Sequence, residues 1–222
     1  IAMPWVKEVP AIVQAWYLGS EAGSAIASVL TGDVNPSGKL PFTFPASLQD
    51  VGAHKLGEYP GTPRNYGSPI VDQKYNEGIF VGYRWADKEK TKPLFSFGHG
   101  LSYTTFAYGK AIADKKVMGQ DETLTITLPV TNTGSREGSE VIQLYISDLK
   151  SSLPRPVKEL KGFSKVKLAP GETREVTFTI GKEALSFFDD ARHEWVAEPG
   201  KFEAWIGASS TDIRNKVAFK LK

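Results

Sequence analysis

Apolar residues in the first part of the chain change from one spacing to another. Residues 11–17 form a continuous apolar run, typical of a buried strand. From there to Leu30 the apolar residues share one helical face, with Ser20 able to cap the first turn and Gly32 to provide the stop. Residues 38–45, bounded by prolines, predict an edge strand. This unit cannot close an α/β layer alone, so we expect it to complete a sheet whose other strands lie elsewhere.

The stretch from about residue 46 to residue 93 is rich in Gly, Pro, Asn and Tyr and has no regular period. A connection of this length is usually functional or wraps over a neighbouring domain. Its aromatic side chains need surfaces to pack on, which distinguishes it from a flexible linker. These aromatic residues are Tyr59, Tyr66, Tyr75, Phe80, Tyr83 and Trp85.

From about residue 104 onward, apolar and polar residues alternate with a period of two, as in half-buried strands. Turn signals containing Gly, Asn or Pro separate the runs. About seven short strands over this length predict a β-sandwich of the immunoglobulin or fibronectin type III kind. The positions expected to face its core are Leu124, Ile126, Leu128, Val130, Ile142, Leu144, Ile146, Val176, Phe178, Ile180, Phe202, Ala204, Ile206, Val217, Phe219 and Leu221.

Composition removes several functional classes. The 222 residues are 41% hydrophobic and 23% charged, as in a globular protein, and the net charge of +2 offers no general field for nucleic acid or membrane. No apolar run approaches the ~20 residues that span a bilayer. Without cysteine there are no disulfides or thiolate metal sites. His54, His99 and His193 lack a second ligand at helical spacing, so we expect no metal site.

Two glutamates are candidate catalytic acids. Glu21 lies between two glycines at the predicted strand-to-helix turn, where a G-x-S-x-G motif would place its nucleophile. The helix dipole favours the anion there, whereas a general acid needs a raised pKa, so we interpret Glu21 as a helix start. Glu77 lies among aromatic residues, which would raise its pKa, and near Arg84, which would lower it. We favour a structural pair of Glu77 with Arg84, and Asp87 is a second possible partner of that arginine.

Two aromatic residues of the predicted sandwich, Tyr145 and Trp205, fall on the faces opposite the core positions of their strands. An outward aromatic ring can stack on a sugar or contact another domain, and we favour the domain contact.

Several stretches together resemble glycoside hydrolase family 3, the β-glucosidase and β-xylosidase family. In the first half they are "VPAIVQAWYLGSEAGSAIASVLTGDVNPSGKLPFTFP", "YNEGIFVGYRW" and "PLFSFGHGLSYTTF". In the second half they are "VTNTGSREGSEVIQLYISD" and "RPVKELKGFSKVKLAPGETREVTFTI". The stretches occur in the family's order and cover nearly the whole chain.

The resemblance implies two structural parts. Residues 1–102 would be the C-terminal part of an α/β-sandwich domain with a long connection, and residues 103–222 a fibronectin type III-like, immunoglobulin-like β-sandwich. The complete protein would be a retaining exo-β-glycosidase, with an Asp nucleophile on an N-terminal (β/α)8 barrel and a Glu acid/base earlier in the α/β-sandwich domain. Two close carboxylates suit this chemistry, because one attacks the anomeric carbon and the other protonates the leaving oxygen. Both would lie upstream of Ile1.

The same resemblance leaves this chain without a catalytic residue. Tyr75, Glu77, Tyr83 and Arg84 remain possible supports on the substrate side. No metal or organic cofactor is needed. The expected partners are the barrel, the first part of the α/β-sandwich domain and an oligosaccharide, and family habit suggests a periplasmic or secreted location.

Two alternatives stay open. The chain could be a carbohydrate-binding module, with Trp205, Tyr145 and the aromatic connection as the sugar platform, or a purely structural module. The first predicts sugar affinity by the isolated chain. Trp205→Ala would separate them, because a platform loses sugar binding and a domain contact loses stability.

Overall fold

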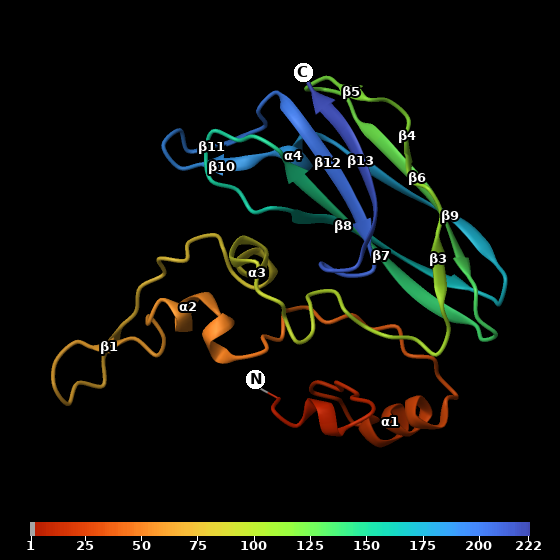
Figure 1. Cartoon of the computed structure of the whole chain (residues 1–222), viewed down its shortest axis with the longest axis horizontal. Helices are drawn as coiled ribbons and strands as arrows, with labels where there is room; N and C mark the ends of the chain where they lie inside the picture. The colour runs from red at the N-terminus through yellow and green to blue at the C-terminus, as the bar shows by residue number, and fades with distance from the viewer. Residues whose placement is uncertain (1–2) are drawn as a thin grey trace.

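The computed structural model describes residues 3–222; Ile1 and Ala2, with which the predicted first domain starts, lie outside the described residues. The second half of the chain folds into a β-sandwich, and the first half runs as an extended ribbon with short helices along one side of it (Figure 1). An α/β segment followed by an all-β sandwich is the predicted fold class, which is confirmed.

One sheet of the sandwich has five strands in the order β5-β13-β12-β7-β8. Strand β5 runs parallel to β13, whereas β13, β12, β7 and β8 pair antiparallel in turn. Register shifts after Leu144 and after Ile206 interrupt otherwise regular ladders. The strands are β5 (Val117–Met118), β7 (Gly138–Asp148), β8 (Glu159–Leu168), β12 (Gly200–Gly207) and β13 (Ile213–Leu221).

The second sheet is built around β6, which pairs antiparallel with β3, β4 and β9. Its strands are β3 (Phe106–Tyr108), β4 (Ile112–Ala113), β6 (Leu124–Asn132) and β9 (Thr173–Ile180). A short helix, α4 (Lys182–Leu185), and a hairpin of β10 (Phe187–Asp189) and β11 (Glu194–Val196) connect β9 to β12.

The core lies between the two sheets and consists of the alternating apolar positions that the sequence predicts. Leu124, Ile126 and Leu128 of β6 are fully buried, as are Ile142 of β7 and Leu221 of β13. Burial of each such side chain stabilises the fold by roughly 1.5–3 kcal/mol. Of the predicted core positions, Val217 is partly buried and packs against the rest.

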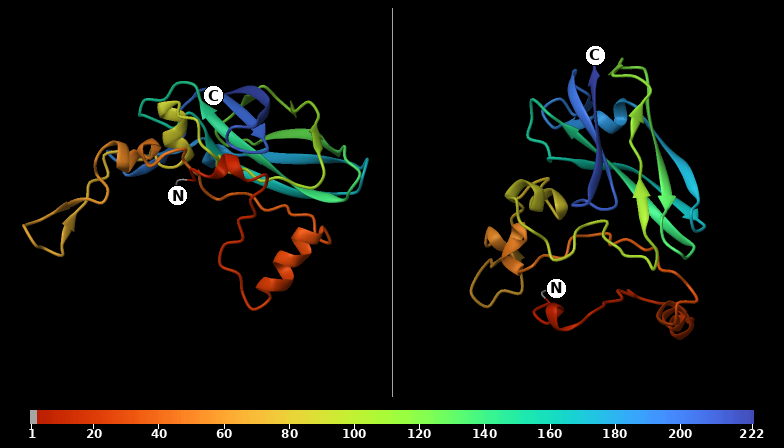
Figure 2. Two further views of the ribbon diagram at one scale, coloured as in Figure 1. Left: turned by 60° about the horizontal axis from the view of Figure 1, so that its bottom comes forward. Right: turned by 45° about the vertical axis from the view of Figure 1, so that its right-hand side comes forward.

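The first half of the chain contains short helices and one small hairpin. Figure 2 shows them on one side of the sandwich, with α1 and the hairpin reaching away from it. None of the helices in residues 3–222 is long and apolar enough to cross a membrane. The elements are η1 (Val6–Glu8), α1 (Ala22–Thr31), η2 (Leu48–Asp50), α2 (Gly52–Lys55), β1 (Thr62–Pro63), β2 (Val71–Asp72) and α3 (Tyr83–Glu89).

The helix predicted in this half is confirmed, but its N-cap is a different residue from the one expected. Glu21, rather than Ser20, occupies the N-cap position of α1, and its carboxylate accepts a hydrogen bond from the Ser24 hydroxyl (3.1 Å). Gly32 ends the helix in the left-handed conformation (φ 81°) that favours glycine, and its N–H donates to the carbonyl of Val29 (3.1 Å).

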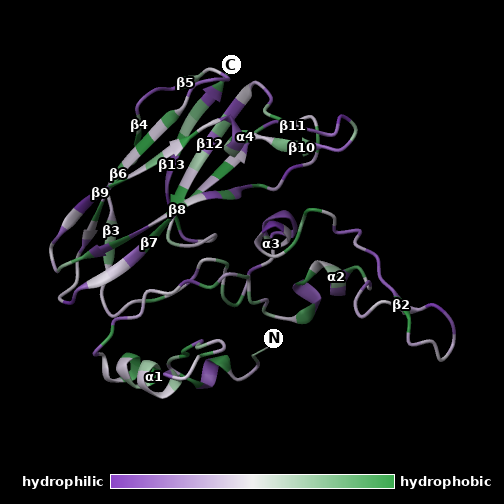
Figure 3. Cartoon of the chain, turned by 180° about the vertical axis from the view of Figure 1, so that it is seen from behind, coloured by the Kyte–Doolittle hydropathy of each residue, from purple (hydrophilic) through white to green (hydrophobic). Residues whose placement is uncertain are grey.

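The two strands predicted in this half are wrong for the described structure. Residues 11–17 form no strand. Residues 38–45 form only an isolated antiparallel β-bridge, between Phe44 and Phe95. A strand needs a neighbour to receive its backbone hydrogen bonds, and residues 3–222 provide no strand beside residues 11–17. The apolar pattern therefore lies on the surface of this segment and of α1 (Figure 3).

Candidate functional site

Helix α3 packs against the five-stranded sheet and carries two of the residues expected on the substrate side. The Tyr83 hydroxyl accepts a hydrogen bond from the backbone N–H of Leu160 on β8 (2.9 Å). The Tyr83 ring meets the Tyr145 ring of β7 edge to face, with centroids 5.9 Å apart. Tyr145 is fully buried, and its hydroxyl donates to Gln143 (2.6 Å). The outward face of β7 is therefore a contact between the two halves of the chain, as the sequence interpretation favours.

Arg84 and Asp87 of α3 both bind charged residues at the start of β8. The Arg84 guanidinium lies 3.2 Å from the Glu159 carboxylate, and the Asp87 carboxylate accepts a hydrogen bond from the Lys158 ammonium. Burial raises the pKa of Asp87, and the hydrogen bond from Lys158 opposes this rise. The predicted pair of Arg84 with Glu77, and the alternative with Asp87, are therefore wrong. Side chains three residues apart share a helix face, and this face of α3 is turned toward β8.

Glu77 is buried, with 8% of its surface exposed, in the segment that leads into α3. It packs beside Gly52 of α2, where an added Cβ atom would lie 3.0 Å from the Trp85 ring and 3.3 Å from the Glu77 Cβ. Within residues 3–222, Glu77 Oε2 and Trp85 Nε1 have no hydrogen-bond partner. Glu77 Oε2 can accept a hydrogen bond and Trp85 Nε1 can donate one, so each atom is free to bind a polar group.

A small cavity of about 90 Å³ lies beside this cluster and is lined by Thr43, Gly52 and Trp85 among others. Thr43 Oγ1 is a further buried polar atom without a hydrogen-bond partner in the described chain. Pockets that hold drug-sized ligands measure roughly 300–1,000 Å³. The cavity therefore suits a small polar group and not a sugar ring.

The other candidate acids and aromatics do not gather at one place. Glu21 is exposed at the start of α1, which agrees with its interpretation as a helix start. Tyr75 is exposed in the loop that precedes buried Glu77. The structure thus brings Tyr83 and Arg84 together against β8 and leaves Tyr75 in solvent.

Of the three histidines, His99 has the most distinctive surroundings. Its ring stacks on that of Phe95, with centroids 5.6 Å apart. Burial, followed by the charge of Lys39, lowers the pKa of His99, and Asp212 opposes this effect. In the part of the chain that the structure describes, no three His, Asp or Glu side chains are grouped closely enough to hold a metal ion.

Trp205 is partly buried and already engaged by charged neighbours. Its indole N–H donates to Glu203 (2.8 Å). The ammonium groups of Lys216 and Lys158 lie 3.4 Å and 5.6 Å from its ring centroid. Such cation–π contacts occupy ring surface that a sugar would need for stacking.

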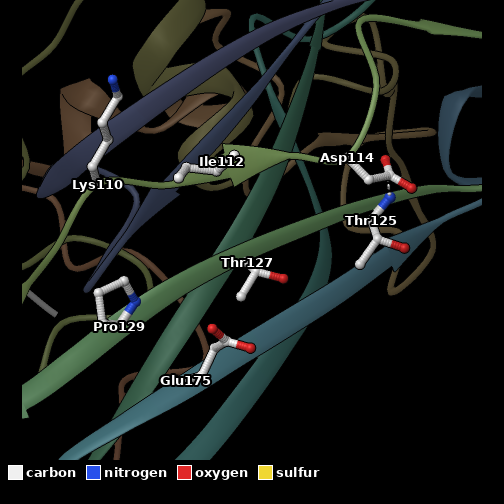
Figure 4. Close-up of a pocket in the computed structure, with 7 residues that line it drawn as sticks. All are labelled: Lys110, Ile112, Asp114, Thr125, Thr127, Pro129 and Glu175. Carbon is white, nitrogen blue, oxygen red and sulfur yellow. Dashed lines mark hydrogen bonds between the residues drawn. The ribbon is translucent and has the colours of Figure 1, made fainter.

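An open groove of about 350 Å³ crosses the outer face of the β6 sheet (Figure 4). The Asp114 carboxylate accepts a hydrogen bond from the backbone N–H of Thr125 (3.0 Å). The groove has no aromatic lining residue and therefore lacks a stacking surface for a sugar. It is lined by Lys110, Ile112, Asp114, Thr125, Thr127, Pro129 and Glu175.

An ion pair that the sequence reasoning missed joins the two halves. Lys39 Nζ lies 3.0 Å from Glu140 Oε1 and donates to the carbonyl of Gly100 (2.8 Å). The Tyr108 hydroxyl also donates to Glu140 (3.3 Å). Glu140 occupies a buried position in the alternating pattern of β7, and a charged residue at such a position is a signal that could have indicated the pair.

These observations define a class of protein: a fibronectin type III-like β-sandwich held by ion pairs and aromatic contacts to a preceding α/β segment. Residues 1–103 match the family model described as the glycosyl hydrolase family 3 C-terminal domain, and residues 140–210 match the fibronectin type III-like domain. The chain belongs to glycoside hydrolase family 3, of which it carries these two C-terminal parts.

The similarity to known proteins extends over almost the whole chain. Beta-glucosidase BoGH3A of Bacteroides ovatus is 54% identical over 99% of this chain. Thermostable beta-glucosidase B of Acetivibrio thermocellus is 43% identical over 96% of it. The crystal structure of the beta-glucosidase from Kluyveromyces marxianus in complex with glucose superposes over 100% of it, with a TM-score of 0.87 and 42% identity. The chain spans 29%, 27% and 26% of the length of these relatives, respectively.

Proposed function

We propose that this chain is the supporting C-terminal part of a retaining exo-β-glycosidase. The complete enzyme is a β-glucosidase that hydrolyses terminal β-linked sugars of oligosaccharides. The observation that carries the proposal is 54% identity to a β-glucosidase over 99% of the chain. The solved relative that holds glucose supports the same substrate class.

The catalytic pair is supplied by parts of the complete protein outside this chain. A retaining glycosidase needs a nucleophilic carboxylate and an acid/base carboxyl about 5–5.5 Å apart, both facing the sugar. Glu21 is exposed at a helix start, and Glu77 is packed beside Gly52 and Trp85. Neither arrangement suits this chemistry. The likeness to glycoside hydrolase family 3 implies an Asp nucleophile and a Glu acid/base upstream of Ile1. No metal or organic cofactor is required for it.

The boundary between the two domains lies between residues 102 and 103, and the two parts have different roles. Residues 1–102 complete the α/β-sandwich domain, and residues 103–222 brace it through the contacts of α3 with β7 and β8. Tyr83 and Arg84 act as supports by holding α3 on the sandwich, and Tyr75 lies at the exposed end of a loop. Glu77 Oε2 and Trp85 Nε1, which have no hydrogen-bond partner within residues 3–222, bind polar groups of the upstream part.

The experiment compares three purified samples: this chain alone, the complete protein, and the chain mixed with the separately produced upstream part. Each is assayed with an aryl β-glucoside and an aryl β-xyloside. We expect hydrolysis by the complete protein, none by the chain alone, and recovery in the mixture. Hydrolysis by the pure chain, abolished by Glu77→Gln or Glu21→Gln, would overturn the proposal and place the catalytic acid here. A preference for the xyloside would correct the substrate.

A further inference from the structure

Residues 59–75, which we call the arm, leave the body of the molecule and return to it as a projecting loop (Figure 2). All residues of the arm except Gly61 and Ser68 are exposed. Two residues clip the ends of the arm together at its root. The buried carboxylate of Glu58 accepts hydrogen bonds from the backbone N–H of Asn76 (3.1 Å) and from the Asn76 side-chain amide. The clip separates the arm from the body, so the arm can open without disturbing the packing behind it.

The contacts within the arm are few and lie in solvent. Strands β1 and β2 contain two residues each, and an isolated hairpin of two strands is marginally stable at best. The Arg64 guanidinium binds the Asp72 carboxylate (2.6 Å), but the two side chains are 57% and 56% exposed. An ion pair this exposed contributes little to stability. The arm therefore belongs to the segments that open locally while the rest of the chain stays folded.

The arm also lies apart from the surface that a further body of protein would cover. The apolar side chains left exposed by residues 11–17 and α1, such as Val13 and Leu30, form that surface. Figures 1 and 2 show the arm and α1 projecting from different ends of the first half of the chain. An upstream part that packs on α1 therefore leaves the arm in solvent.

The arm contains a peptide bond that suits an endoprotease cleaving after arginine. Arg64 is exposed and follows β1 directly, where the hairpin gives way to its tip. The next residue is Asn65, which keeps the backbone N–H and the free φ that proline would remove. Arg155 lacks this feature, because Pro156 follows it. Exposed loop tips with small and polar residues are the preferred places for proteolytic nicking.

The other arginines are held by the folded body. Arg192 is the strongest competitor, because it lies in the exposed turn of the β10–β11 hairpin. That hairpin has a shorter loop, residues 190–193, and the rings of Phe188 and Trp195 pack across it with centroids 5.7 Å apart. Arg84 lies in α3, Arg136 in the turn between β6 and β7, Arg174 in β9 and Arg214 in β13.

Contacts across the Arg64–Asn65 bond hold the two sides of the chain together. The backbone N–H of Leu40 donates to the carbonyl of His99, and the N–H of Gly98 donates to the carbonyl of Leu40, both at 2.8 Å. The ion pair of Lys39 with Glu140, with side chains 12% and 7% exposed, lies beside this ladder. These contacts and the clip join residues before the bond to residues after it, so they survive its cleavage.

We propose that the arm is a site of limited proteolysis, where an arginine-directed endoprotease cleaves after Arg64 and converts the protein into a two-chain form that stays assembled. Cleavage consumes one water molecule. The C–N bond between Arg64 and Asn65 breaks, Arg64 gains a carboxylate and Asn65 gains an α-ammonium group. The body on either side of the arm keeps its fold.

The test treats the native complete protein with a small amount of clostripain, which cleaves after arginine, and identifies the fragments by mass and N-terminal sequence. Within these 222 residues, the first cut should fall between Arg64 and Asn65. Arg64→Gln should abolish that cut, whereas Arg192→Gln, the matched control at another exposed turn, should leave it unchanged. The two fragments should elute together in size-exclusion chromatography and separate only in denaturant.

Three outcomes would overturn the inference. The arm is covered or too rigid if clostripain leaves Arg64 uncut in the native protein at an amount that cuts the urea-unfolded protein there. The choice of bond is wrong if another arginine of this chain is cut first. The two-chain form does not exist if the fragments separate without denaturant. None of these measurements uses a substrate, so they stand apart from the test of the proposed function.

Discussion

Replacing Lys39 by methionine should weaken the contact between the two halves of the chain. The side chains of Lys39 and Glu140 are 12% and 7% exposed, and their charged atoms lie 3.0 Å apart. The substitution removes the positive charge and keeps most of the apolar volume. Glu140 then stays buried with the hydrogen bond from Tyr108 as its remaining side-chain contact of this kind in the described chain.

The expected loss of stability follows from the distance between the two charged groups and from their burial. Two unit charges 3.0 Å apart attract by about 5.5 kcal/mol at an effective dielectric constant of about 20. Desolvation of both ions offsets most of this attraction, so the intact pair contributes little net stability. Losing one partner leaves the desolvation of the other uncompensated, at a cost of about 3–5 kcal/mol. Lys39→Met with Glu140→Leu removes both charges and should recover most of that loss.

Urea denaturation followed by the near-ultraviolet circular dichroism of the aromatic residues measures the free energy of unfolding. For a chain of this size, about 3–5 kcal/mol corresponds to a melting temperature lowered by roughly 6–20 °C. Lys165→Met, at an exposed position of β8, is the control and should change little. A loss below about 1 kcal/mol for Lys39→Met, the range of exposed pairs, would refute the reasoning.

Three further predictions concern neighbouring contacts. Lys158→Met should cost about 3 kcal/mol and speed amide exchange in α3, because Lys158 is 3% exposed and is paired there with the partly buried Asp87 carboxylate; unchanged exchange would contradict this. The pKa of His99 is lowered from its ordinary 6.5, so its stabilising contribution is complete above about pH 6.5 and is lost as the pH falls through the interval below it. His99→Phe should flatten the melting temperature against pH there, and an unchanged slope would argue against it. Gly100→Ala should cost about 1–3 kcal/mol in thermal denaturation, because its Cβ would lie 2.2 Å from the Gly38 carbonyl oxygen, whereas Gly19→Ala, with open space around it, should be tolerated.

The sandwich is predictable because both sides of each core contact lie within the chain. Alternation in β6 places Leu124 and Ile126 inward, and the inward residues of the facing sheet, such as Ile142, follow the same rule. A pattern of period two is sufficient here, since a one-residue slip would expose every one of these side chains. Helix α1 is predictable for a local reason, because Gly32 ends it through its own backbone conformation.

Charge pairing was less predictable, because it depends on how an element is rotated against its neighbour. Arg84 and Glu77 are close in sequence, and that closeness favoured a pair. The packing of Tyr83 on Tyr145 instead turns the helix so that Arg84 reaches Glu159. Sequence distance does not report this rotation. The outward position of Tyr145 in the pattern of β7 indicated a contact with another part of the protein. No feature of the sequence identified Tyr83 on α3 as its partner.

The apolar run of residues 11–17 fails as a strand for a reason that also bears on Glu77. A continuous apolar run is typical of a strand buried on both faces, whereas residues 3–222 leave most of these side chains exposed. Glu77 Oε2 and Trp85 Nε1 likewise record hydrogen bonds that residues 3–222 do not supply. Leaving such buried groups unpaired costs about 1–3 kcal/mol each, which a natural sequence has little reason to keep. Both features are expected if the upstream part of a β-glycosidase packs there, pairs with residues 11–17 and supplies hydrogen-bond partners to Glu77 and Trp85.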